Sequence, residues 1–196
     1  MSELENKALV EANIPTSWGK FKMYAFDSGK EDLPHLALVA ENTDLTKTVN
    51  VRLHSECLTG DVFGSLRCDC GDQLHGALKY VEENGGMIIY LRQEGRGIGL
   101  VNKLKAYNLQ DAGMDTAQAN IALGFHADER DFTPGVEILK AFGVKEIRLL
   151  TNNPAKYDSF QNSGIEIKER VAIATPLHDE NKFYLETKRN VFGHLL

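Results

Sequence analysis

Short apolar runs alternate along the chain with longer amphipathic stretches. Five runs are predicted to be strands, because they are short, rich in large or β-branched apolar residues and bounded by turn residues. They are HLALVAE (35–41), KTVNVRLH (47–54), MIIYL (87–91), EIRLL (146–150) and IEIKERVAI (165–173). The third run is apolar almost throughout, which is typical of a buried strand.

Helical spacing dominates the segments between these runs. A helix is predicted over DQLHGALKYVEENGG (72–86), with Gly85 suited to end it. Its expected buried stripe consists of Leu74, Ala77, Leu78 and Val81. A second helix is predicted after EGRG (94–97), and its expected buried side consists of Ile98, Val101, Leu104 and Leu109.

Two further helices carry signals at their starts. A helix over 116–122 is predicted with Thr116 as its cap, and a helix over 133–143 is predicted with Thr133 as N-cap and Pro134 in the first position.

Alternating strands and helices define an α/β protein. We expect a single three-layer α/β/α-type domain with a mixed sheet, spanning residues 1–196. Residues 1–12 and the extreme C-terminus are expected to be flexible, and the tail NKFYLETKRNVFGHLL (181–196) is expected to be helical before it ends.

Composition and charge narrow the class of function. Of 196 residues, 42% are apolar and 26% are charged, which is ordinary for a globular protein. No apolar run approaches the roughly 20 residues that cross a bilayer, and the charged N-terminus has no apolar signal region, so we expect a cytoplasmic protein without a membrane partner. The net charge of −6 argues against nucleic acid as a partner.

Basic residues nevertheless gather in the central part of the chain, which fits a compact anion such as a nucleotide. They are Arg52, Arg67, Arg92, Arg96, Lys103, Lys105 and Arg130.

All three cysteines lie in one stretch, SECLTGDVFGSLRCDC (55–70), at Cys57, Cys68 and Cys70. Three thiolates would leave one of the four tetrahedral zinc positions for a water, whose pKa the metal lowers to roughly 7, and this spacing favours a catalytic zinc. Other interpretations stay open: His54 or His75 as a fourth ligand of a structural zinc, a redox-active Cys-x-Cys pair, or buried thiols without a metal.

Three loops are candidates for anion binding and proton transfer. RQEGRGIG (92–99) lies between an apolar strand and a helix and offers glycines and two arginines. LLTNNPAK (149–156) repeats this plan with capping asparagines and Lys156 in the first helical turn, where a cation opposes the helix dipole unless an anion binds. HADERDFTPG (126–135) places acidic groups beside an arginine. Each loop alone also fits an ordinary capped turn or solvated charge.

Together, the segments RLHSECLTGDVFGSLRCDCG, RQEGRGIGL, KAYNLQD, ADERDF and LLTNNPAK resemble GTP cyclohydrolase II of riboflavin biosynthesis in order and spacing. The resemblance covers nearly the whole chain, and C-x10-C-x-C is its most specific part. Some relatives carry a fused dihydroxybutanone-phosphate synthase domain, for which this chain is too short, so a monofunctional enzyme is expected.

The resemblance implies a role for each matching position. Cys57, Cys68 and Cys70 would bind Zn²⁺, while Asp128 would accept a proton and Arg130 would attack the α-phosphate. Tyr107 matches an active-site tyrosine. The positions that match GTP-binding residues are Arg52, Leu53, His54, Ser55, Glu56, Gln73, Glu94, Gly95, Arg96, Thr116, Thr151 and Lys156.

The implied reaction converts GTP and water to 2,5-diamino-6-ribosylamino-4(3H)-pyrimidinone 5′-phosphate, formate and pyrophosphate. C8 of guanine is an electrophilic carbon between two nitrogens, and Mg²⁺ on the phosphates would assist pyrophosphate loss. A guanidinium has a pKa above about 12 and is a poor nucleophile, so physical chemistry favours Arg130 as a clamp on the α-phosphate. Glu94 is a candidate acceptor for the guanine edge.

Two other functions compete with this one. The first is a related enzyme that stops at the ring-opened formamide or uses another purine nucleotide. The second is a non-catalytic, zinc-stabilised nucleotide-binding protein. The combination of the three cysteines with Tyr107, Asp128 and Arg130 favours the enzyme, and a homodimer is expected by resemblance alone.

Overall fold

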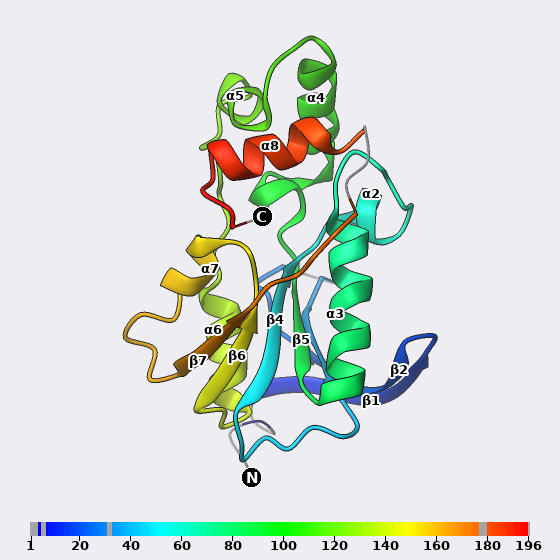
Figure 1. Cartoon of the computed structure of the whole chain (residues 1–196), viewed down its shortest axis with the longest axis vertical. Coiled ribbons are helices and arrows are strands. Elements are labelled where there is room, and N and C mark those ends of the chain that lie inside the picture. Colours follow the sequence, from blue (N-terminus) through cyan, green and yellow to red (C-terminus); the bar gives the residue numbers. More distant parts are fainter. Residues whose placement is uncertain (1–3, 5–6, 31–32, 177–179, 196) are drawn as a thin grey trace. The chain divides into compact units, whose positions relative to one another are not determined.

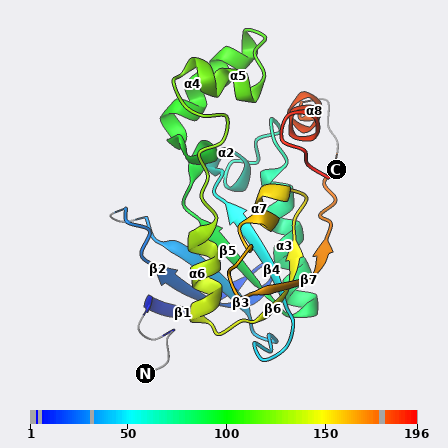
Figure 2. The same ribbon diagram turned by 90° about the vertical axis from the view of Figure 1, so that its left-hand side faces the viewer.

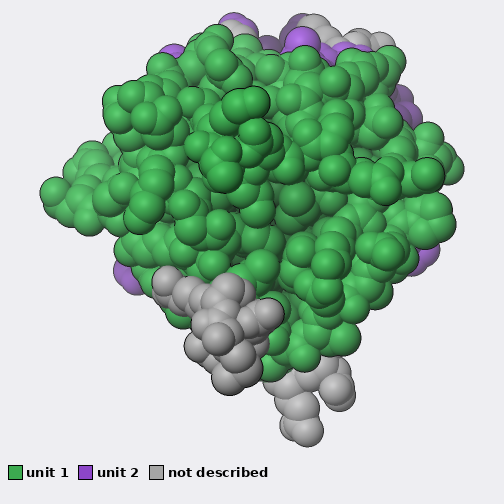
Figure 3. Space-filling view, turned by 90° about the horizontal axis from the view of Figure 1, so that it is seen from below, with its two compact units in different colours: residues 1–54, 74–92, 132–173 green, residues 55–73, 93–131, 174–196 purple. Residues whose placement is uncertain are grey.

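The computed structural model describes residues 4, 7–30, 33–176 and 180–195. The chain divides into two compact units, coloured separately in Figure 3. Unit 1 comprises residues 1–54, 74–92 and 132–173, and unit 2 comprises residues 55–73, 93–131 and 174–196. The expectation of one domain over 1–196 is not decided by this division and stays a prediction.

A seven-stranded sheet is the frame of unit 1, with the order β1-β2-β3-β5-β4-β6-β7 (Figure 1). Its strands are β1 (Ala8–Thr16), β2 (Gly19–Phe26), β3 (His35–Ala40), β4 (Val49–Ser55), β5 (Met87–Leu91), β6 (Glu146–Leu150) and β7 (Glu166–Val171). Strands β1, β2, β3 and β5 pair antiparallel in turn, whereas β4 with β6 and β6 with β7 pair parallel. The predicted mixed sheet is therefore confirmed.

Helices cover both faces of this sheet (Figures 1 and 2). Helix α6 (Thr133–Ala141) packs into the larger apolar cluster, and α3 (Cys70–Asn84) packs into the smaller one. The strands alternate between the two clusters, since Ile89 of β5 joins the first and Ile88 joins the second. The short helix α7 (Pro154–Asp158) follows β6. The predicted α/β/α layering is confirmed in unit 1.

Unit 2 is built mainly from helices and loops. It contains α2 (Leu58–Asp61), the 3-10 helix η1 (Glu94–Gly97), α4 (Gly99–Asp111), α5 (Thr116–Ala122), α8 (Lys182–Asn190) and the start of α3. Across the described part of the chain, every helix is too short or too polar to cross a membrane.

The N-terminal hairpin of β1 and β2 was not predicted. Most side chains of β1 are exposed, so its sequence shows no buried period. Residues 8–12, which were expected to be flexible, lie in β1, while residues 1–3, 5–6 and 196 of the expected flexible ends lie outside the described residues.

Two predicted helix caps are wrong. Asp115 caps α5 by accepting from the backbone N of Gln118 at 2.8 Å, and Thr116 is already helical. Thr133 is likewise the first residue of α6, which follows Phe132 and has no side-chain cap. Aspartate is a better N-cap than threonine. In α5, Asp115 forms a capping box with Gln118 and so takes the role that was expected for Thr116.

The predicted buried side of α4 is wrong at two of its four positions, while Ile98 is buried and Leu109 is half-buried. Val101 and Leu104 are 68% and 47% exposed, whereas Lys103 and Ala106 are buried. The apolar pattern failed at these positions because the buried face of α4 carries Lys103 instead of a leucine.

Candidate functional site

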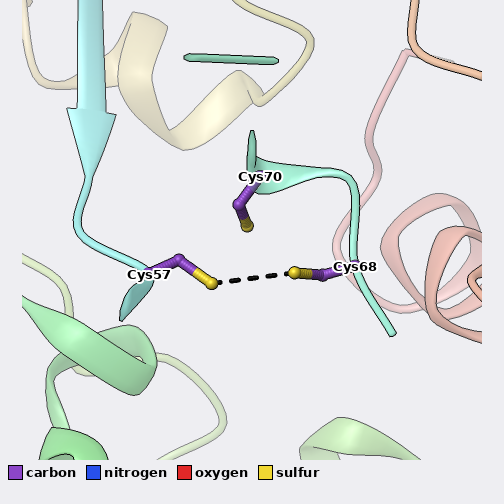
Figure 4. Close-up of side chains that lie close together, drawn as sticks. All are labelled: Cys57, Cys68 and Cys70. Carbon is purple, nitrogen blue, oxygen red and sulfur yellow. Dashed lines mark hydrogen bonds between the residues drawn. The ribbon is translucent and has the colours of Figure 1, made fainter. Parts of the chain in front are cut away.

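The three cysteines converge where α2 and α3 begin (Figure 4). Cys57 precedes α2, and Cys68 and Cys70 lead into α3. Their sulfur atoms all lie within 4.8 Å of one another, and those of Cys57 and Cys68 are 3.6 Å apart, too far for a disulfide. Among the described residues this group of metal-ligating side chains holds no histidine. That composition fits a metal site with one position left open.

Glycines make room for the sulfur atoms. A Cβ added to Gly60 would lie 3.0 Å from the sulfur of Cys68 and 3.3 Å from that of Cys57. A Cβ on Gly71 would lie 2.5 Å from the carbonyl oxygen of Gly60. The loop can therefore close around the thiols only because both positions lack a side chain.

The thiols share charge in a defined way. Hydrogen bonds from Cys68 and Cys70, with Lys103 nearby, hold the pKa of Cys57 far below its usual range. Sharing with the ionised Cys57 raises the pKa of Cys68 to about 11. Cys57 is therefore the first of the three to become a thiolate, which is the form of cysteine that binds a metal cation.

Lys103 of α4 links the cysteines to η1. Its Nζ lies 3.1 Å from the sulfur of Cys57 and 2.8 Å from Oε1 of Glu94. Burial alone would lower the pKa of Lys103, but the negative charge of Cys57 and the hydrogen bond to Glu94 raise it. The side chain is therefore a fixed cation beside the thiolate.

Glu94 is held by three donors from the chain. Its carboxylate accepts from the backbone N of Leu58 at 2.5 Å and of Gly95 at 2.6 Å, in addition to Lys103. These bonds connect the first residue of α2, the start of η1 and α4.

Tyr107 lies one helical turn after Lys103 on α4, so both side chains share one face. Its hydroxyl is 3.4 Å from that of Thr59, and Arg67 stacks over its ring with 4.9 Å to the centroid. Burial raises the pKa of Tyr107, so its hydroxyl is protonated at neutral pH.

Arg96 has an unusual backbone in η1. Gly95 and Arg96 both adopt left-handed φ angles, 62° and 60°, which strain a residue with a side chain. The backbone N of Glu129 donates to the carbonyl of Arg96 at 3.0 Å, and a Cβ on Gly97 would lie 2.9 Å from the Cβ of Glu129. The strained turn is thus held against the 126–131 loop.

Asp128 and Arg130 form a bidentate pair in that loop. Asp128 accepts from Nε of Arg130 at 2.8 Å and from its NH2 at 2.5 Å, and Arg96 lies 3.7 Å from the same carboxylate. Burial opposes ionisation, but the arginines lower the pKa of Asp128, and Asp128 raises the pKa of Arg130. Both groups are therefore charged at neutral pH.

The other predicted positions of unit 2 have structural partners of their own. Ser55 accepts from Nε2 of Gln93 at 3.0 Å, and Gln73 donates to Asp69 at 2.6 Å. Thr116 begins α5. Glu56 lies between the end of β4 and the first cysteine.

Unit 1 holds the remaining predicted residues near the ends of β4 and β6. Arg52 donates to the carbonyl of Leu150 at 3.0 Å, and Lys156 donates to the carbonyl of Leu53 at 2.6 Å. Asn153 caps α7, as predicted for this loop.

His54 and Thr151 complete this group in unit 1. The ring of His54 stacks on that of Tyr90, and the hydroxyl of Thr151 accepts from the backbone N of Asn153 at 3.0 Å. Both residues are almost fully buried, as are Arg52 and Lys156. The polar residues in the last part of β4 and after β6 thus lie toward the carboxyl ends of parallel strands.

The sequence reading assigned no role to Thr59, Asp69 or Lys188, and counted Lys103 only among the basic residues. The four-residue spacing of Lys103 and Tyr107 was the one available signal for a shared helical face. Asp69 and Lys188 are 119 residues apart, and no local pattern links them.

An α/β unit together with a unit that gathers thiols, a carboxylate and arginines of shifted pKa is typical of an enzyme. The family model described as GTP cyclohydrolase II matches residues 6–172, so the chain belongs to the GTP cyclohydrolase II family. The resemblance drawn from the sequence is confirmed.

Curated relatives agree with this family. Riboflavin biosynthesis proteins RibBA from Staphylococcus saprophyticus and Chlorobium phaeovibrioides are each 51% identical to the whole chain and covered over 49% and 48% of their length. RibBA from Bacillus cereus is 52% identical over 95% of this chain and 47% of its own. The chain thus spans about half the length of these relatives.

A solved structure, the two-domain 3,4-dihydroxy-2-butanone 4-phosphate synthase RibBX from A. baumannii, matches 86% of this chain and 40% of its own length. Its TM-score is 0.46 at 19% identity.

Proposed function

We propose that this chain hydrolyses GTP to 2,5-diamino-6-ribosylamino-4(3H)-pyrimidinone 5′-phosphate, formate and pyrophosphate, a step of riboflavin biosynthesis. The observation that carries the proposal is the convergence of Cys57, Cys68 and Cys70, with Lys103 against the first of them. Family membership supports GTP as the substrate.

Cys57, Cys68 and Cys70 are the proposed Zn²⁺ ligands. Three sulfurs in a glycine-lined pocket fit this ion by donor type and number. Bound there, zinc would act as a Lewis acid and keep one position for water. Three thiolates with one Zn²⁺ carry a net charge of −1, and the Lys103 cation at 3.1 Å from Cys57 neutralises it.

Glu94 is proposed to orient Lys103 and the start of α2. Its carboxylate already accepts hydrogen bonds from three donors of the chain. Few of its roughly four acceptor positions are therefore left for the N–H groups of guanine. Tyr107, kept protonated by burial, is proposed as a hydrogen-bond donor to the substrate.

Arg130 is proposed as an electrostatic clamp for the α-phosphate. Asp128 holds its guanidinium in a bidentate pair and raises its pKa, which disfavours the neutral form that a nucleophile requires. Arg96 adds a second cation beside the same carboxylate. Mg²⁺ on the substrate phosphates is proposed to share this charge neutralisation.

Other proposed substrate-binding residues of unit 2 are Ser55, Glu56, Gln73, Gly95 and Thr116, and those of unit 1 are Arg52, Leu53, His54, Thr151 and Lys156. A cytoplasmic homodimer without nucleic acid or membrane partners is proposed with them. The net charge of −6 supports the absence of a nucleic-acid partner. The exposed apolar residues Leu9 and Val10 on the edge strand β1 support contact with a second copy of the chain.

The test is to incubate purified protein with GTP and Mg²⁺, with and without a zinc chelator, and to measure formate and pyrophosphate separately. We expect both products with zinc and neither after its verified removal. Formate release that persists without zinc would refute the role of the cysteines. Accumulation of a formamide, detected by mass, would identify an enzyme that stops after ring opening. A trapped covalent phosphoguanosine adduct on Arg130 would refute the clamp.

A further inference from the structure

Asp69 is a buried carboxylate between two of the three clustered cysteines. It is 0% exposed, and Cys68 and Cys70 are its chain neighbours. Its oxygens accept from Gln73 at 2.6 Å, from the hydroxyl of Thr175 at 3.2 Å, and from the ammonium of Lys188. Asp69, which lies between Cys68 and Cys70, is therefore held in place in part by Thr175 and Lys188 of the C-terminal segment.

Lys188 belongs to α8 and is 5% exposed. A carboxylate that is removed from water this completely is costly unless a cation and further donors compensate it. The position of the Cys68–Cys70 turn is consequently tied to the position of α8. Neither group is a metal ligand, and neither was assigned a role by the family resemblance.

The same segment reaches a second predicted site residue. The ring of Phe192 lies 3.7 Å from the guanidinium carbon of Arg96, a cation–π contact. Arg96 is the residue with the strained left-handed backbone, and its guanidinium also lies beside Asp128. Contact with Phe192 restricts the side chain of Arg96, whose backbone is held by the η1 turn and by the hydrogen bond from Glu129.

We propose that the C-terminal segment, described at residues 174–176 and 180–195, is a positioning part of the catalytic site. Lys188 acts through Asp69 to hold the turn that carries Cys68 and Cys70, and Phe192 holds Arg96. The segment lies beyond residues 6–172, which the family model matches. The inference rests on the proposed zinc site. It adds Lys188 and Phe192, which lie outside the cysteine motif, as residues that position that site.

The first test measures zinc retention. Wild type, Lys188→Met and Asp69→Asn would be purified, their zinc content determined by mass spectrometry, and the rate of zinc transfer to a colorimetric chelator recorded. We expect both variants to release zinc about 10 to 100 times faster, the usual effect of removing a support of metal ligands. Lys182→Met, on the exposed side of the same helix, is the matched control and should release zinc at the wild-type rate.

A double variant, Asp69→Asn with Lys188→Met, keeps the test decisive if a single variant fails to fold. It removes both charges together and leaves no buried unpaired ion, so it is expected to fold. It should still release zinc at least about tenfold faster than wild type. Release within twofold of wild type from the folded double variant would overturn the role of the pair. Wild type that binds no zinc at all would instead refute the proposed function.

The second test addresses Phe192 through substrate kinetics. Phe192→Ala is expected to raise KM for GTP about fivefold, the value of a partly exposed cation–π contact, with little change in kcat and in zinc release. Val191→Ala, an exposed neighbour, is the control. An unchanged KM, or a faster release of zinc in Phe192→Ala, would overturn the assignment of Phe192 to Arg96.

Discussion

The two units of this chain are stabilised by different chemistry. In unit 1, strands and helices bury two apolar clusters, and both clusters found among the described residues consist of unit 1 side chains. Unit 2 is held instead by thiols, the Lys103–Glu94 pair, the Asp128–Arg130 pair and the buried Asp69–Lys188 pair. The groups that stabilise unit 2 are thus the groups proposed to perform its chemistry.

This difference teaches where stability depends on a ligand. Apolar burial stabilises unit 1 whether or not substrate or metal is present. The metal proposed for the three thiols would stabilise unit 2, so we expect folding of unit 2 to be coupled to metal binding. Unit 1 should therefore behave as a permanent scaffold, and unit 2 as a metal-dependent one.

The largest effect is expected from removal of the metal, which should destabilise unit 2 and leave unit 1 folded. Cys68→Ser should abolish stoichiometric zinc binding and lower formate release at least about a thousandfold, since Lewis-acid assistance is worth several kcal/mol. Hydrogen exchange, measured by mass spectrometry, should accelerate in residues 55–73 and 93–131 and stay slow in the strands of unit 1. Equal acceleration in both units would show that the comparison is wrong.

The converse change strikes the apolar scaffold. Leu139→Ala in α6 removes a fully buried side chain of the larger cluster and should lower the free energy of unfolding of unit 1 by about 2–5 kcal/mol. Zinc stoichiometry at moderate temperature should not change. Urea unfolding of the variant and of wild type, followed by hydrogen exchange, tests this expectation. The variant would contradict it by losing zinc more readily than wild type while its unit 1 is still folded.

A third change removes charge from unit 2 without touching a metal ligand. Arg130→Ala should lower the release of both pyrophosphate and formate about a hundredfold or more, because a clamp on developing phosphate charge is lost. Zinc content should stay at the wild-type value.

Two variants control the Arg130 experiment. Lys105→Ala removes an exposed cation of α4 and should leave turnover unchanged. Arg130→Lys tests geometry, and substantial turnover in that variant would argue against a requirement for a bidentate guanidinium.

The smallest expected effect is a pH dependence in unit 1. Burial, with Lys30 and Arg92 nearby, lowers the pKa of His35 from 6.5, and its neutral Nδ1 accepts from the backbone N of Arg92 at 3.0 Å. The unfolded chain then binds more protons below pH 6.5, so this contribution to stability is complete above pH 6.5 and is lost as the pH falls toward the lower folded value.

Unfolding of unit 1 by urea at pH 7.5 and at pH 5.5 would measure that loss. His35→Gln should show a smaller difference between the two conditions than wild type. An equal difference in both proteins would assign the pH dependence to other groups.

The sequence predicted unit 1 better than unit 2. The strands from β3 to β7 and helices α3 and α6 are visible from their apolar periods, because side chains packed against a sheet repeat with the geometry of the backbone. The edge strand β1 is mostly exposed and shows no such period. In α4 the expected apolar face was wrong at Val101 and Leu104, because Lys103 occupies the buried side.

The proposed site shows the same limit. The cysteines lie within 14 residues of one another, so their grouping was visible as a motif. The donors around Glu94 and the partners of Asp69 come from separate segments, and their approach depends on tertiary packing that no local pattern encodes. Residues that act by supporting others were therefore the ones missed.

The pairing of Asp69 with Lys188 also has a consequence for the order of events during synthesis. The cation that pairs with the carboxylate between Cys68 and Cys70 is synthesised 119 residues after that carboxylate. Until α8 has left the ribosome, Asp69 lacks its cation, and Gln73 is the nearest of its partners in the chain. A nascent chain can therefore expose its thiols to the surrounding metal and redox chemistry throughout the synthesis of the 119 residues that separate Asp69 from Lys188.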